Sequence, residues 1–293
     1  MLQYVIMDIK KTNENMGRLY ILIAAILWSM GGFLIKNIDA NPAFIALGRS
    51  AIAGIALFPF IRFRNIKNIK KLILLSLSYS TCLTTFVIST KLTAAANAIT
   101  IQYSAPLFLF VGLWAITKKL DKQKIIPMIL ILFGIIAFLL EPISGSNMSG
   151  NLLAVISGIS FALVIYLFGF DYGLSGIGLT ALLNLMIVPV VAIIVPWGST
   201  PYPTDLTSII CLTILGIVQI GVSYVFFYAG RRRVSSIDAS ILSLIEPVLN
   251  PIWVFILIGE KPSYYAIFGM VLILSAQVLN AFLEYRENKK KLA

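Results

Sequence analysis

The feature that most limits the fold is a succession of apolar runs, each about as long as a bilayer is thick. A helix crosses the membrane core with about 20 mostly apolar residues. Of the 293 residues, 59% are hydrophobic and only 12% are charged, which excludes a soluble domain of this size. The connections between these runs are too short to contain a separate soluble domain. The ten predicted spans are Leu19–Ile35, Phe44–Ile61, Leu72–Thr90, Ala95–Thr117, Ile125–Leu140, Leu152–Phe170, Ile177–Val195, Leu206–Gly230, Ile237–Ile258 and Tyr264–Leu283.

The basic residues predict the orientation of these spans. When the connections are placed on alternate sides, nineteen of the 23 Lys and Arg residues fall on the side of the two termini. Only Lys36, Lys91 and Lys261 fall on the other side, and Arg49 lies within a span. The positive-inside rule therefore predicts cytoplasmic termini and an even number of spans. The net charge of +11 is accounted for by these loops, so no nucleic-acid partner is expected.

Two absences limit the chemistry. The chain has no histidine and only two cysteines, Cys82 and Cys211, which fall within apolar spans as small core residues. A His/Cys metal cluster and a catalytic histidine are therefore excluded, and neither a metal nor a cofactor is expected. No G-x-x-x-x-G-K-[ST] loop occurs, which argues against ATP-driven pumping by this chain.

Weak internal similarity divides the spans into five plus five. Gly17 and Leu19 match Gly150 and Leu152 at an offset of 133 residues, and Pro106 matches Pro247 at an offset of 141. Because five is odd, the second repeat enters the membrane from the opposite side. We predict an all-α integral membrane protein of ten transmembrane helices in two inverted five-helix repeats, a design that places a substrate near the midplane. The expected limits are a cytoplasmic tail at 1–16, repeats at 17–141 and 150–283, and a basic cytoplasmic tail at 284–293.

The ninth span combines an acid with a helix breaker. A carboxylate near the bilayer centre costs about 3 kcal/mol on insertion scales, and a proline frees a backbone carbonyl. Ser243, Glu246 and Asn250 share one helical face beside Pro247, and Asp238 lies nearer the cytoplasmic end. The fourth span shows the same pattern, with a polar stripe before its proline that consists of Asn97, Thr100 and Ser104, flanked by Gln102 and Tyr103.

These charged residues have alternative interpretations. Glu246 acts in transport, through proton coupling, gating or substrate binding, or else holds helices together by a hydrogen bond. Arg49 binds a substrate carboxylate or phosphate or pairs with Glu246, or else forms a structural ion pair or reaches an interface. Asp238 is expected to pair locally with the Arg231–Arg233 loop, and it and Glu246 are the candidate proton carriers. The aromatic residues in the spans either form walls of a site or serve as core and interface anchors; they include Trp28, Tyr79, Tyr224 and Tyr228.

Together these motifs resemble a ten-span member of the drug/metabolite transporter superfamily, of the EamA type. The resemblance rests on Gly17 to Trp28-Ser29, on Arg49, on Lys91 to Pro106, on Ala239 to Pro247, and on Gly259-Glu260. It implies an inner-membrane carrier of small organic metabolites, often an exporter of amino acids, whose central cavity is lined or gated by Trp28, Arg49, Asn97, Tyr103, Glu246 and nearby positions of spans three and eight. The first repeat departs from the second by having Ala105 and Lys119 where Glu246 and Glu260 stand.

The leading hypothesis is therefore a secondary active transporter of a small-molecule substrate, working by alternating access within membrane lipid. One alternative is a membrane enzyme acting on a lipid or lipid-linked substrate, which would need clustered acids at one membrane face. Another is a channel or assembly subunit, which would lack saturable uptake. A homodimer, the substrate's identity, the direction of transport and its driving force are left open.

Overall fold

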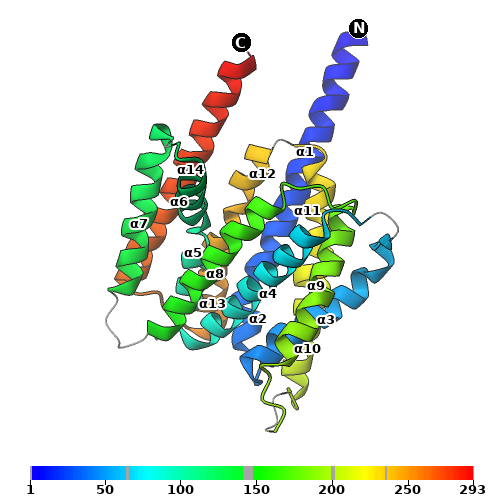
Figure 1. The fold of residues 1–293 in the computed structure, drawn as a ribbon, viewed down its shortest axis with the longest axis vertical. Helices are drawn as coiled ribbons and strands as arrows, with labels where there is room; N and C mark the ends of the chain where they lie inside the picture. Colours follow the sequence, from blue (N-terminus) through cyan, green and yellow to red (C-terminus); the bar gives the residue numbers. More distant parts are fainter. Residues whose placement is uncertain are drawn as a thin grey trace.

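The computed structural model describes residues 2–63, 66–119, 121–140, 148–198, 202–234 and 236–292, and all regular secondary structure in these residues is helical. Figure 1 places both ends of the chain at the same end of the helical bundle. The helices are α1 (Leu2–Ser29), α2 (Gly31–Lys36), α3 (Pro42–Leu57), α4 (Ile69–Leu92), α5 (Ala95–Gln102), α6 (Ala105–Thr117), α7 (Ile125–Leu139), α8 (Met148–Leu167), α9 (Gly176–Ala192), α10 (Leu206–Ile214), α11 (Ser223–Arg231), α12 (Ser236–Ser243), α13 (Ile245–Ile258) and α14 (Tyr264–Leu292). Short 3-10 helices occupy Phe58–Phe60 and Lys122–Lys124, and a π-helical segment, η4, occupies Leu215–Val222.

These helices form the ten predicted crossings. In the described part of the chain, nine helical stretches are long and apolar enough to cross a membrane, and α9 is a shorter apolar helix of 17 residues. Four crossings are composite: α1 with α2, α5 with α6, α10 through η4 to α11, and α12 with α13. The seventh ends at Ala192, before the predicted Val195, because the chain turns ahead of Pro196. Helix α1 begins well before its membrane-length part, Asn13–Lys36.

The composite fourth and ninth crossings are interrupted at equivalent places. Helix α5 ends at Gln102 and α6 starts at Ala105, immediately before Pro106, while α12 ends at Ser243 and α13 starts at Ile245, two residues before Pro247. Proline lacks an N–H, so it fits the first turn of a helix without loss, whereas in the helix interior it removes a backbone hydrogen bond. Each proline therefore begins a new helix inside the membrane.

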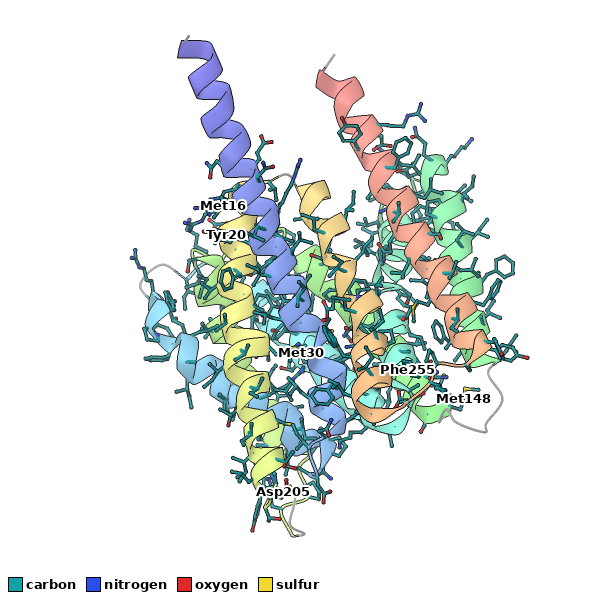
Figure 2. The ribbon with its side chains drawn as sticks, turned by 180° about the vertical axis from the view of Figure 1, so that it is seen from behind. Met16, Tyr20, Met30, Met148, Asp205 and Phe255 are labelled. Atoms are coloured by element: carbon teal, nitrogen blue, oxygen red, sulfur yellow. The ribbon has the colours of Figure 1, made fainter. Side chains whose placement is uncertain are left out.

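The packing of the helices follows the symmetry of the two repeats. The third crossing, α4, packs on the sixth, α8, and the eighth, α11, packs on the first, α1. If each crossing is replaced by its equivalent in the other repeat, the contact between the third and sixth crossings becomes the contact between the eighth and first, and the reverse. The contacts of α3 with α9 and of α7 with α14 each map onto themselves. Seen from behind, α12 and α13 lie between α1 and α14 (Figure 2). The chain is thus ten transmembrane helices in two inverted repeats.

Two close contacts between helices repeat at opposite ends of the bundle. A Cβ added to Gly150 would lie 2.8 Å from the Cβ of Thr93, and one added to Gly17 would lie 2.8 Å from a methyl carbon of Val234. Gly17 and Gly150 are the matched residues at offset 133, and Thr93 and Val234 are separated by 141. Small residues let the backbones approach at both places, as is common in membrane helix pairs.

Candidate functional site

A hydrogen bond connects the two interrupted helices. The Tyr103 hydroxyl donates to Glu246 Oε2 at 2.8 Å, where Tyr103 follows α5 and Glu246 lies in the first turn of α13. A carboxylate in the first turn of a helix is stabilised by the exposed N–H groups and the helix dipole. Gln277 of α14 donates in turn to the Tyr103 carbonyl, which the interruption leaves available. The interruptions thus place an acid and a phenol together between the two repeats.

Arg49 lies on the buried side of α3 without a counter-ion. Its side chain is 2% exposed and Nε has no hydrogen-bond partner. Two ion pairs occur in the described part of the chain, Lys36–Glu260 and Lys67–Asp171, and neither includes Arg49. Arg49 therefore does not form the ion pair with Glu246 that was one of its predicted alternatives.

Hydroxyl and thiol groups surround the Arg49 guanidinium. Its electrostatic partners are Tyr79 and Cys82 of α4 and Tyr224 of α11. The Asn184 amide donates to the Tyr79 hydroxyl at 3.3 Å, which anchors Tyr79 to α9. A Cβ on Gly216 would lie 2.9 Å from the Arg49 carbonyl, so the π-helical segment packs directly on the α3 backbone at this residue. π-Helical turns in α-helices occur frequently at functional sites.

An aromatic wall lies between α1 and α11. The Trp28 ring is 5.1 Å from the rings of both Tyr224 and Phe227, and Tyr224 is 6.0 Å from Tyr228. The Tyr228 hydroxyl also lies 3.4 Å from the Thr180 hydroxyl. Trp28, Tyr79, Tyr224 and Tyr228, which were candidates from sequence, therefore lie near one another on three helices, α1, α4 and α11.

Asn250 faces the start of α2 and is a second buried polar group without partners. It is 1% exposed, and neither its amide oxygen nor its amide nitrogen has a hydrogen-bond partner. A Cβ added to Gly32 would overlap the Asn250 amide, so only glycine admits this side chain. Next to it, Gln219 Nε2 donates to the Trp28 carbonyl at 3.3 Å and its Oε1 is unpartnered. These amides bring polar atoms to the point where the first crossing changes from α1 to α2.

Two other predicted residues form hydrogen bonds within their own helix or to one neighbouring helix. Ser243 donates to the Ala239 carbonyl at 2.8 Å in its own helix. Asn97 donates to Asn151 Oδ1 at 3.3 Å and so joins α5 to α8 away from the helix interruption. The backbone of Asp238 belongs to α12, but its side chain lies outside the described residues.

The structure adds polar residues that were not among the candidates. Asn184 and Gln219 are isolated amides in apolar spans, a signal that could have selected them. Trp253 donates from its indole nitrogen to Ser29 Oγ at 2.9 Å and ties α13 to the end of α1. Among the described residues, no group of three or more His, Cys, Asp and Glu side chains is placed to hold a metal ion.

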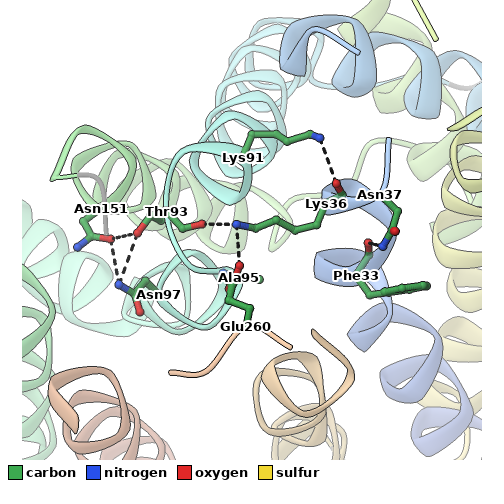
Figure 3. Close-up of polar contacts among 9 residues, drawn as sticks. All are labelled: Phe33, Lys36, Asn37, Lys91, Thr93, Ala95, Asn97, Asn151 and Glu260. Carbon is green, nitrogen blue, oxygen red and sulfur yellow. Dashed lines mark hydrogen bonds and ion pairs between the residues drawn. The ribbon is translucent and has the colours of Figure 1, made fainter. Parts of the chain in front are cut away.

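A polar network connects helices at the end of the bundle where Lys36 and Lys91 lie (Figure 3). Lys36 Nζ is 2.9 Å from Glu260 Oε2 and donates to the Thr93 carbonyl at 2.8 Å. Glu260 Oε1 accepts from the Ala95 N–H at 2.7 Å, at the start of α5. Lys91 donates to the Lys36 carbonyl at 3.3 Å. We call Lys36, Lys91, Thr93, Ala95 and Glu260 the outer network, after the side of the membrane that the Lys and Arg distribution predicts for this end. It joins the first, third and fourth crossings to the ninth.

The opposite end differs in its charges. Lys119 stands at the position equivalent to Glu260, so the symmetric acid is missing. The ion pair there, between Lys67 and Asp171 at 2.9 Å, has side chains 61% and 67% exposed. The Gly173 N–H and the Lys67 ammonium hold the pKa of Asp171 below its usual value. An exposed pair of this kind contributes little to holding helices together.

The comparisons with known proteins agree with this architecture. The model of the EamA-like transporter family matches residues 15–140 and again residues 148–282. A solved structure titled only "Crystal structure of protein" is 16% identical and has a TM-score of 0.63, over 92% of this chain and 98% of that chain, which shows a shared fold. The comparison with curated proteins gave no match. Since the family model covers nearly the whole chain in two repeats, the protein belongs to the EamA-like transporter family and is a multi-pass membrane transporter of the drug/metabolite type.

Proposed function

We propose that the protein is a secondary active carrier that exports small organic metabolites, with amino acids the best substrate class, across the inner membrane by alternating access. In this proposal its termini are cytoplasmic, as the distribution of Lys and Arg indicates. The substrate binds among Arg49, the tyrosines and Glu246, between the repeats. Glu246 is the candidate proton carrier, with Asp238 as a second one.

The single observation that carries the proposal is a buried polar site between the two repeats, which an ion-paired network joins at one end of the bundle. The outer network holds four crossings from both repeats together, through an ion pair whose side chains are 19% and 25% exposed. At the other end, the described ion pair is exposed and the acid equivalent to Glu260 is replaced by Lys119. A buried polar site between two inverted repeats that are tied together by breakable polar contacts supports a carrier that opens to one side at a time.

The alternatives have less support. A membrane enzyme would need clustered acids or a histidine pair at one face, and the chain contains no histidine. A channel has no need for a site that holds buried, unpartnered polar atoms, because tight binding slows conduction.

Counterflow in proteoliposomes tests the function. Purified protein is reconstituted in vesicles loaded with a mixture of the protein amino acids, and uptake of each labelled amino acid is followed at trace concentration. A carrier gives transient, saturable accumulation that excess unlabelled substrate competes. Uptake that rises linearly with concentration would instead support a channel, and absence of counterflow with every amino acid would refute amino acids as the substrate class.

A further inference from the structure

The buried polar side chains that have atoms without hydrogen-bond partners differ in charge. Amide and hydroxyl groups without partners, such as those of Asn250 and Thr100, are neutral. Arg49 carries a full charge, stays protonated in proteins, and is 2% exposed. Of all the unsatisfied groups in the described residues, its guanidinium therefore has the greatest need of a partner.

The surroundings of Arg49 supply dipoles but no counter-charge. Tyr79 and Tyr224 offer hydroxyls, and Tyr79 is held in place by the Asn184 amide. The one carboxylate described on the neighbouring interrupted helices, Glu246, accepts its hydrogen bond from Tyr103. No hydrogen bond or ion pair reaches Arg49 from the described part of the chain. A buried cation among neutral groups is left without a balancing charge, and a bound anion would supply that charge.

The charge and shape of the site indicate which anion. A guanidinium presents its donors as a planar fork that matches a carboxylate or a phosphate. Here a single cation is surrounded by neutral hydroxyl groups, so one negative charge balances it, whereas the second charge of a phosphate monoester would be left buried and unpaired. We propose that Arg49 binds the carboxylate of the substrate, so that transported molecules must carry this group; this inference rests on the proposed carrier function.

The first test needs no knowledge of the exact substrate. Thermal unfolding of the detergent-purified full chain is measured in potassium chloride, acetate and phosphate at equal ionic strength, and with mixtures of the protein amino acids or of their amides. For the unmodified protein we expect acetate and the amino acids to raise Tm, and the amides and phosphate to have no effect. A ligand that binds only the folded state raises the apparent stability.

Substitution of Arg49 assigns the effect. Arg49→Gln should weaken acetate and amino-acid binding by about 10- to 100-fold, the range for losing charged hydrogen bonds. It should also raise Tm in chloride, because the unbalanced buried charge is gone. Arg49→Lys, which keeps the charge but loses the fork, should bind with intermediate affinity. Arg62→Gln is the matched control, since Arg62 follows α3 on the exposed surface, and it should leave the anion effects unchanged.

Several outcomes overturn the inference. A loss of stability of Arg49→Gln in chloride, together with an undiminished response to acetate, would make Arg49 structural. A response to phosphate but not to acetate would replace the carboxylate by a phosphate. Counterflow separates the two proposals: amino-acid transport that survives Arg49→Gln with unchanged KM refutes the role of Arg49 but leaves the carrier standing. Anion binding that depends on Arg49, without counterflow of any amino acid, refutes the proposed amino-acid carrier and leaves the carboxylate site at Arg49.

Discussion

Loss of the ion pair in the outer network should favour opening of that end. Glu260→Gln removes the charge facing Lys36 but keeps an oxygen that can accept from the Ala95 N–H. At the observed 2.9 Å separation and an effective dielectric constant of about 20, the gross attraction is about 6 kcal/mol. Water recovers most of this when the partners separate, so we assign the pair a net value of about 1–2 kcal/mol. Since about 1.4 kcal/mol is a factor of ten, the open fraction should rise about tenfold.

Thiol labelling measures this change directly. Val254, which is 1% exposed on α13 behind the outer network, is replaced by cysteine in a Cys82→Ala/Cys211→Ala background. A membrane-impermeant thiol reagent is added outside intact cells. With Glu260 present we expect slow labelling, and with Glu260→Gln a rate about tenfold higher.

A matched control removes the other ion pair. Asp171→Asn breaks the Lys67 contact, which has the same 2.9 Å separation but exposed side chains at the opposite end. It should leave the labelling of the introduced cysteine unchanged. The reasoning is refuted if Glu260→Gln has no effect on the labelling rate, or if Asp171→Asn raises it equally.

Two further predictions concern the interrupted helices and the repeat interface. Glu246→Gln keeps an acceptor for the Tyr103 hydroxyl, so the protein should fold with nearly unchanged Tm. Counterflow should slow at least about tenfold and lose any pH dependence, because the side chain can no longer carry a proton. Unchanged transport across pH would reduce Glu246 to a structural role. Gly269→Ala should lower the stability by about 1–3 kcal/mol, because the new Cβ would lie 2.7 Å from Phe138 and 2.9 Å from the Gly134 carbonyl. Gly112→Ala has nothing within 4 Å and should not lower Tm, and equal losses in the two variants would contradict this explanation.

Most of the architecture could be predicted from the sequence. Ten apolar runs and the matched glycines and prolines predicted two inverted repeats of five helices, which the structure and the family match confirm. The cytoplasmic termini indicated by the Lys and Arg distribution stay a prediction. These signals are readable because each helix partitions into the membrane by its own hydrophobicity and flanking charge, largely without regard to its neighbours. The sequence also singled out Arg49, Glu246 and Asn250, because polar groups are rare in apolar runs.

Only the tertiary structure decided which of these residues contact one another. The sequence left open whether Glu246 pairs with Arg49, whereas in the structure it accepts from Tyr103 and Arg49 faces tyrosines of two other helices. The outer network likewise joins residues more than 150 positions apart in the chain, such as Ala95 and Glu260. Hydropathy specifies how deep a residue lies in the membrane, but the rotation and pairing of helices depend on side-chain packing at small residues and interruptions. For this reason the sequence by itself determined the crossings and their division into two repeats, and only the packed bundle decided the contacts that make up the site.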